Sequence, residues 1–393
     1  MEIDFVSWFG LALRWFHFMI GIMWIGTSFY FIWLGNSLKP PHSREDKQAG
    51  VAGESWLVHG GGFYHNKKYA VAPDHMPEDL HWFKWEAYFT WISGVLLLAL
   101  IYYYDASLYL IDRAKNNLDP SEAILIGLAF IVGGWFFYDG LCKTGIGRNN
   151  GLFGLIWFAA LTAAAYALNQ LFSGRGAYIH VGAIIGTVMA ANVFAIIIPN
   201  QKKVVASLLA GEKPDPRLGK KAGQRSLHNN YMTLPVLLIM ISNHYPMLFG
   251  NPHSWLILAG LSAAAWLIRH FFNLKDMGIM NYWYAAAGVA GFILVMLLVS
   301  GGKTAATPSA AVSASEVRQI VRTHCSACHS DTPTYEGISE APAGVMFDTM
   351  EEIKKYAPRI IVRATENGDM PLGNTTNMTD EERKKLKAGL TEK

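Results

Sequence analysis

The segment AYIHVGAIIGTVMAANVFAIIIP, residues 177–199, decides the fold class of this chain. It contains no Lys, Arg, Asp or Glu, and His180 and Asn192 are its most polar side chains. An α-helix rises about 1.5 Å per residue, so a helix of this length crosses the roughly 30 Å hydrocarbon layer of a membrane. We therefore predict that these residues form a membrane-spanning helix.

Seven other apolar segments have the length of a span: about 8–34, 84–104, 123–142, 151–172, 231–250, 254–273 and 282–301. Charged residues make up 16% of the chain, against roughly 25% in soluble domains. The first segment is longer than the apolar core of a signal peptide, so we expect it to be retained. The net charge of +3 is too small to indicate a nucleic-acid partner. The predicted fold is all-α, with a polytopic membrane bundle of eight helices in residues 1–301.

The distribution of Lys and Arg in the loops predicts the orientation of this bundle. The loops 35–83, 143–150, 200–230 and 269–281 lie on one side and together hold sixteen of these residues. The opposite side holds three before the C-terminal region begins. Because the richer side normally faces the cytoplasm, we expect both termini in the periplasm, with the bundle in a bacterial inner membrane.

The C-terminal region has the composition of a small soluble domain with a covalent haem. Residues 302–314 are small and polar and predict a flexible linker, and residues 315–393 are charged and helix-prone. The segment CSACH, Cys325 to His329, has the C-x-x-C-H spacing of c-type haem attachment. Cys325 and Cys328 would form the thioethers, and His329 would be the proximal iron ligand. We predict a class I-like cytochrome c domain that carries one haem c.

Met370 is the preferred candidate for the sixth iron ligand. It precedes Pro371 in the sequence GDMPL, residues 368–372, well downstream of His329. Met346 and Met378 remain alternatives, because a Met near a haem often only packs. Met–His ligation raises the reduction potential, so this haem would accept electrons readily.

Polar side chains in the outer half of the predicted spans suggest a second cofactor. His17, His180 and His244 lie in the half of the membrane nearer the C-terminal domain, and Arg14 is one turn from His17. Ionisable groups within spans are costly and therefore candidates for function. Two of these His could bind a haem b, with Arg14 near a propionate. Alternatively, they could form hydrogen bonds between helices.

A second polar set is expected near the cytoplasmic side, where it would form a pocket. Amide and imidazole groups suit a flat polar heterocycle that loses protons as it is oxidised. Each of these residues could instead cap a helix or satisfy a loop. His65, Glu86 and His228 are the candidate bases. The set is His65, Glu86, Asp139, Asn192, His228, Asn229 and Asn230, with His59, His75 and His81 from the same polar loop as His65.

With these segments placed, the chain closely resembles the membrane-bound, cytochrome c-linked urate oxidase family, PuuD. The resemblance covers nearly the whole chain and continues through the CSACH domain. Its motifs are GVAGESWLVHGGGFYHNKKY (50–69), MPEDLHWFKWEAYFT (76–90), IIIPNQKKVVA (196–206), GEKPDP (211–216) and QRSLHNNYMTLPVLLIMISNHYP (224–246).

The resemblance implies a urate hydroxylase that converts urate to 5-hydroxyisourate without forming peroxide. Electrons would pass to the haem c and then to a respiratory cytochrome c or oxidase. The resemblance does not identify which residues of the bundle are catalytic. Two alternatives remain: a membrane electron-transfer or transport subunit, and a haem-linked dehydrogenase of another substrate. A haem–copper oxidase is excluded, because the spans lack the His-Pro-Glu helix that such a centre requires.

Overall fold

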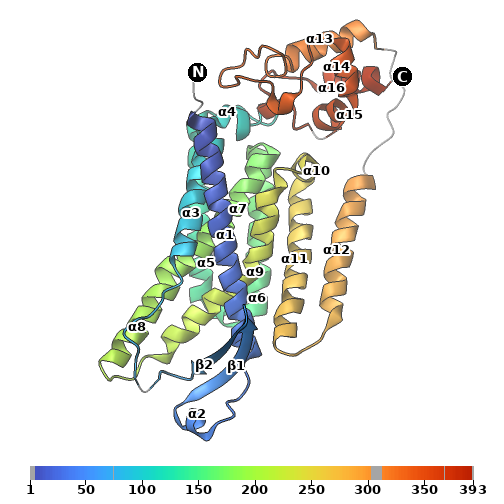
Figure 1. Ribbon diagram of the computed structural model, residues 1–393. Coiled ribbons are helices and arrows are strands. Elements are labelled where there is room, and N and C mark those ends of the chain that lie inside the picture. Colours follow the sequence, from blue (N-terminus) through green and yellow to red (C-terminus); the bar gives the residue numbers. More distant parts are fainter. Residues whose placement is uncertain (1–4, 74, 302–311, 367, 392–393) are drawn as a thin grey trace.

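The computed structural model describes residues 5–73, 75–301, 312–366 and 368–391, and these form a helix bundle with a small helical domain at one end (Figure 1). A β-hairpin and the end of a long helix project from the opposite end (Figure 1). The start of the first helix and the end of the last bundle helix lie at the end that carries the small domain (Figure 1). The bundle helices are α1 (Phe5–Ser37), α3 (Trp85–Leu98), α5 (Pro120–Lys143), α6 (Asn150–Leu171), α7 (Gly174–Ala191), α9 (Pro216–Ser242), α11 (Ser254–Asp276) and α12 (Tyr282–Gly301).

Shorter elements connect these helices. A π-helical segment, Ala99–Tyr103, extends α3, and another, Asn192–Ile197, joins α7 to α8 (Ile198–Leu209). Helix α2 (Arg44–Gln48) precedes the hairpin, and α4 (Ala106–Tyr109) and α10 (Pro246–Phe249) are short turns between bundle helices.

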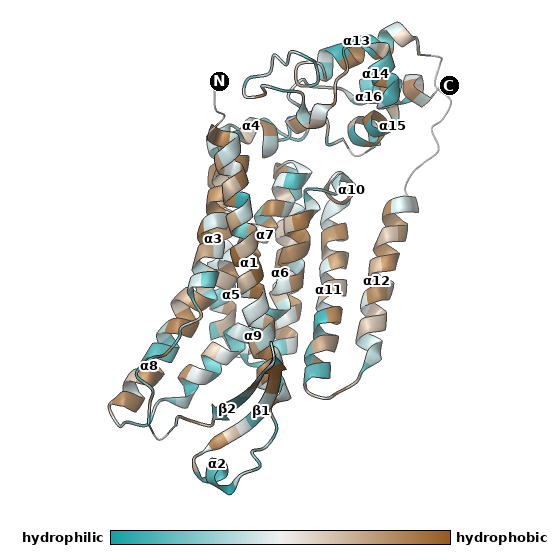
Figure 2. Ribbon diagram, viewed as in Figure 1, coloured by the Kyte–Doolittle hydropathy of each residue, from teal (hydrophilic) through white to brown (hydrophobic). Residues whose placement is uncertain are grey.

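Within the described residues, seven helices are long and apolar enough to cross a membrane, which confirms seven of the eight predicted spans by length and composition. Their apolar surfaces are most evident on the outer helices α1 and α12 (Figure 2). The segment predicted as the span 231–250 instead consists of the end of α9, a break, and α10. Helix α9 is too polar to meet the same criterion, but it packs between α7 and α11 inside the bundle. A helix enclosed by its neighbours needs little lipid-facing apolar surface.

Small residues allow α7 to pack closely against its neighbours. A Cβ at Gly134 of α5 would lie 2.6 Å from Ile184, and a Cβ at Gly182 would lie 2.6 Å from Ile239 of α9. Helix interfaces in membranes favour such residues, because they let backbones approach each other. The bundle core is therefore centred on α7, which is the helix most enclosed by the others.

The all-α prediction is wrong for the loop 35–83, which contains an antiparallel β-hairpin. Strand β1 (Val51–His59) pairs with β2 (Gly62–Tyr69), and His59 faces Gly62 across a two-residue turn. The turn residues Gly60 and Gly61 have φ of 59° and 80°, which suits the type I′ turn favoured in hairpins. The glycine pair between two β-prone runs is the signal that the helical prediction overlooked.

The small domain is built from four helices around one apolar cluster. Helix α13 (Ala314–His324) begins after Ser313, whose side chain accepts a hydrogen bond from the Glu316 amide. The other helices are α14 (Met350–Lys355), α15 (Ala357–Ile360) and α16 (Asp380–Thr391). Val321, Ile353 and Leu386 are fully buried between them. Residues 302–311 of the predicted linker lie outside the described residues.

Candidate functional site

A cavity of about 330 Å³ lies between α1, the segment before α3, the α7–α8 connection and α9. It is near the end of the bundle that carries the hairpin. Its volume is at the lower end of the range for small-molecule sites, about 300–1,000 Å³. The lining residues include Trp24, Thr27, Ser28, Phe31, His81, Trp82, Phe83, Met189, Val193, Gln201, Ser226, Asn229 and Thr233.

The lining combines aromatic faces with hydrogen-bonding groups. Trp24, Phe31, Trp82 and Phe83 contribute rings, the hydroxyls come from α1 and α9, and the amides come from α8 and α9. His81 is the titratable side chain of this lining, and its ring meets the Phe83 ring edge-on at a centroid distance of 4.5 Å. Aromatic faces can stack on a flat ring, and an imidazole can take a proton from it.

A buried polar network lies directly behind the cavity wall. The side-chain oxygen of Asn229, which lines the cavity, accepts a hydrogen bond from the side-chain NH2 of Asn192 at 2.8 Å. The side-chain oxygen of Asn192 accepts a hydrogen bond from Arg225 at 3.1 Å. Arg225 also donates to Asp139 at 2.6 Å, and Asp139 pairs with Lys143 at 2.5 Å. The network thus holds Asn229 in place and leads from the cavity to the exposed Lys143.

Tyr138 and His228 branch from the same network. The Tyr138 hydroxyl accepts from Asn192 at 2.9 Å and lies 2.8 Å from Nδ1 of His228. The Tyr138 hydroxyl donates to Nδ1 or accepts from it, according to the tautomer of His228. Phe153 stacks on the His228 ring at 4.3 Å. Nε2 is buried and has no hydrogen-bond partner within the described part of the chain.

The structure thus brings together Asp139, Asn192, His228 and Asn229, but it places Asn230 in a different cluster. The side-chain oxygen of Asn230 accepts hydrogen bonds from Arg269 at 3.1 Å and from Asn273 at 2.9 Å. Arg269 also lies over the Phe29 ring at 4.2 Å. This cluster joins α9 to α11 and α1, and none of its residues lines the cavity.

His65 and Glu86 also lie outside the cavity lining. His65 belongs to the hairpin, where it pairs with Glu54 at 2.7 Å and stacks on Trp56 at 4.1 Å. The His42 amide, and then His65, lower the pKa of Glu54. Glu86 lies in the first turn of α3 and is partly exposed. Of the three candidate bases from the sequence, only His228 is therefore next to the cavity wall.

The outer-half polar residues have different surroundings. His17 lies 2.8 Å from the Ser93 hydroxyl. His180 is fully buried; its Nδ1 donates to the Gly176 carbonyl at 2.8 Å, which leaves Nε2 to accept from Tyr103 at 3.0 Å. His244 and Arg14 are exposed. The bonds of His17 and His180 agree with the hydrogen-bonding alternative, and the haem b stays a prediction.

The C-terminal domain presents a ligand set that fits a c-type haem. His329 Nδ1 donates to the Val345 carbonyl at 2.9 Å, which leaves Nε2 for an iron, as is usual for an axial His. Burial lowers the pKa of His329, which keeps its ring neutral. Burial raises the pKa of Cys325 to about 12, so this side chain is a neutral thiol, the form that adds to a haem vinyl group. Met370 packs against the same apolar cluster.

The other candidate sixth ligands are placed differently. Met378 is 3% exposed and belongs to the apolar core of the domain. Its amide donates to the Asn374 side chain at 3.0 Å. Met346 is partly exposed and lies next to Val345, which holds His329. Met370 remains our preferred sixth ligand.

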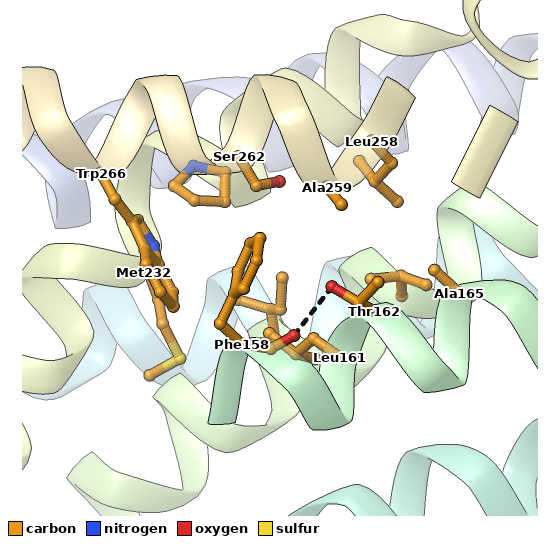
Figure 3. A pocket seen from close by; sticks show the side chains of 12 residues that line it. Phe158, Leu161, Thr162, Ala165, Met232, Leu258, Ala259, Ser262 and Trp266 are labelled. Carbon is orange, nitrogen blue, oxygen red and sulfur yellow. Dashed lines mark hydrogen bonds between the residues drawn. The ribbon is translucent and has the colours of Figure 1, made fainter. Parts of the chain in front are cut away.

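A second cavity in the bundle is too small for a substrate. It has a volume of about 20 Å³ and lies between α6, α7, α9 and α11 (Figure 3). Figure 3 shows its mostly apolar lining, in which the Thr162 hydroxyl already donates to the Phe158 carbonyl at 2.9 Å. This volume is roughly that needed for one water molecule.

Several lining residues were missed at the level of sequence. Trp24, Gln201 and Ser226 have side chains of types common in any helix. His81 belonged to the predicted polar set but was not among its candidate bases. The signal that could have identified Ser226 is its place in the motif QRSLHNN, residues 224–230, which also holds Arg225, His228 and Asn229.

Comparison with known proteins gives one match. A family model described as urate oxidase N-terminal matches residues 4–300. The match covers the bundle and ends before the C-terminal domain. No curated protein and no solved structure matches the chain.

Proposed function

The chain belongs to the urate oxidase N-terminal family, and from this premise we propose that it oxidises urate in the cavity between α1 and α9. The product would be 5-hydroxyisourate, formed without peroxide. Electrons would pass to the C-terminal domain and then to a respiratory cytochrome c or oxidase. The family makes the chain an oxidoreductase related to urate oxidation, and its apolar helices are consistent with a membrane protein.

The observation that carries this proposal is the lining of the 330 Å³ cavity. Urate is a flat, fused-ring heterocycle with ring N–H groups and carbonyl oxygens around its rim. The rings of Trp24, Phe31 and Trp82 offer faces for stacking, while Gln201 and Ser226 offer hydrogen bonds to the rim. Among the lining residues His81 is the one suited to act as a general base.

The reaction requires water and an electron acceptor. Uric acid and water give 5-hydroxyisourate, two protons and two electrons, and water supplies the added hydroxyl. We assign the first proton transfer to His81. Asn192 and Arg225 act as positioning residues, because they hold Asn229 in the cavity wall.

A c-type haem bound by Cys325, Cys328 and His329 would supply one-electron redox chemistry. The final oxidant would be a ferric cytochrome c or a respiratory oxidase.

The proposal predicts that urate alone reduces the haem of the purified chain. Anaerobic addition of urate should shift the Soret and α bands to those of ferrous haem c, and stopped-flow absorbance measures the rate. Xanthine and a quinol should give no reduction on this time scale. A chain that is reduced by a quinol and not by urate would contradict the proposal and support the electron-transfer alternative.

A further inference from the structure

Among the described residues, the C-terminal domain contacts the bundle at residues 105–113, which we call the docking segment. It contains α4 and the residues that follow it (Figure 1). The Arg113 amide donates a hydrogen bond to the Gly373 carbonyl at 3.4 Å. Gly373 has φ of +59°, and a Cβ there would lie 2.6 Å from the Ser107 carbonyl oxygen and 3.0 Å from that of Leu108. The close approach therefore depends on a glycine at position 373.

The docking segment is firmly attached to the bundle. Leu110 and Ile111 are buried, with exposed fractions of 0% and 1%. The Ser173 amide donates to the Leu110 carbonyl at 2.8 Å, and its hydroxyl donates to the Tyr109 carbonyl at 2.8 Å. These bonds tie the segment to the start of α7, so it offers the C-terminal domain a rigid surface.

The two sides of this contact carry charges of opposite sign. Arg175, at the start of α7, and Asp112 belong to the bundle, and Asp369 and Arg383 belong to the C-terminal domain. Asp369 pairs with Arg363 of its own domain at 2.6 Å. Arg175 Nε and Asp369 Oδ1 are both buried, and neither has a hydrogen-bond partner among the described residues. Complementary charges of this kind set the orientation in which two surfaces meet.

The same contact involves the loop that carries Met370. Arg383 donates to the Met370 carbonyl at 2.7 Å and to the Asn374 side chain at 3.3 Å. The loop from Met370 to Asn374 is therefore held as a unit, with Gly373 against the docking segment. The loop of the proposed sixth ligand thus faces the bundle.

We propose that the docking segment is the surface across which electrons leave the bundle for the C-terminal domain, with Gly373 as the residue that permits the contact. This inference rests on the proposed function, since it assumes that urate is the electron donor. Each urate releases two electrons, which cross one at a time. A c-type haem held by Cys325, Cys328 and His329 would accept each electron, and a ferric cytochrome c would reoxidise it. The acceptor must bind a face of the domain other than the one that contacts the docking segment.

The test compares Gly373→Ala with Gly368→Ala in the full-length protein loaded with haem. Gly368 also has a positive φ, +65°, but no atom lies within 4 Å of a Cβ built there. Both substitutions place a Cβ at a position of positive φ in the loop that carries Met370. Only the Cβ added in Gly373→Ala would contact the docking segment. We expect faster amide hydrogen exchange at Arg113 in Gly373→Ala and wild-type exchange in Gly368→Ala. Urate-driven haem reduction should slow about tenfold or more in Gly373→Ala alone, because electron transfer depends on positioning. Reduction by dithionite should be equal in the two variants, and so should the midpoint potential.

Three results would separate the possible failures. Unchanged exchange at Arg113 in Gly373→Ala would overturn the role of Gly373 in docking. Increased exchange with wild-type urate-driven reduction would overturn the electron-transfer role of the contact. If urate fails to reduce the wild-type haem, the proposed function fails, while the exchange measurement still reports on docking. Arg175→Gln serves as a second variant, and we expect the same direction of change in both measurements.

Discussion

Replacing His81 by Gln should lower the urate-driven rate of haem reduction by about 10²- to 10⁴-fold, which is the usual contribution of a general base. His81 is the lining side chain suited to accept a proton from a substrate in the 330 Å³ cavity. Gln keeps a similar size and hydrogen-bonding capacity but cannot act as a base at neutral pH. Stopped-flow absorbance at saturating urate measures the effect on kcat.

His59→Gln is the matched control. His59 is exposed at the end of β1, beside the hairpin turn, and lies outside the cavity lining. We expect it to retain the wild-type rate. If His228→Gln abolished the reaction while His81→Gln left it intact, the base would instead lie behind the cavity wall. A large loss in His65→Gln would contradict the placement of the site in this cavity, because His65 pairs with Glu54 in the hairpin.

Replacing Arg225 by Leu should destabilise the bundle by about 3–5 kcal/mol, the typical cost of removing one partner of a buried ion pair. The side chain of Arg225 is 5% exposed, and it bonds to both Asp139 and Asn192. Its loss would leave a buried carboxylate with one remaining partner and the side-chain oxygen of Asn192 without its donor. The free energy of unfolding in mixed micelles, titrated with a denaturing detergent, measures the change.

Lys143→Gln provides the control on the same carboxylate. Lys143 pairs with Asp139 at 2.5 Å, but its side chain is 70% exposed. Water therefore screens the pair, and its loss should cost about 0–1 kcal/mol. Equal destabilisation by the two substitutions would show that the network is solvated and would remove the argument that it positions Asn229.

The sequence predicted the helices of the bundle well, because each span is recognised from a local run of apolar residues. The segment 177–199 is an example, and it lies within a continuous helix from Gly174 to Leu209. The prediction failed at residues 51–69, where two glycines form a hairpin turn, and it overestimated the apolar character of α9. Helix α9 can carry polar residues because its neighbours enclose it and supply hydrogen-bond partners, and enclosure is not visible in a local window of sequence.

The candidate site shows what only the tertiary structure decided. The sequence by itself identified the polar residues at the hairpin end of the bundle and the complete CSACH motif, whose ligands are close along the chain. The sequence could not distinguish the positions of Asn229 and Asn230. Asn229 lines the cavity, whereas Asn230 bonds to Arg269 in another cluster. Neighbouring residues of a helix with 3.6 residues per turn point about 100° apart. The surroundings of each side chain therefore depend on which helix packs against that face, and this packing brings His81 and Asn229 to one cavity from distant parts of the chain.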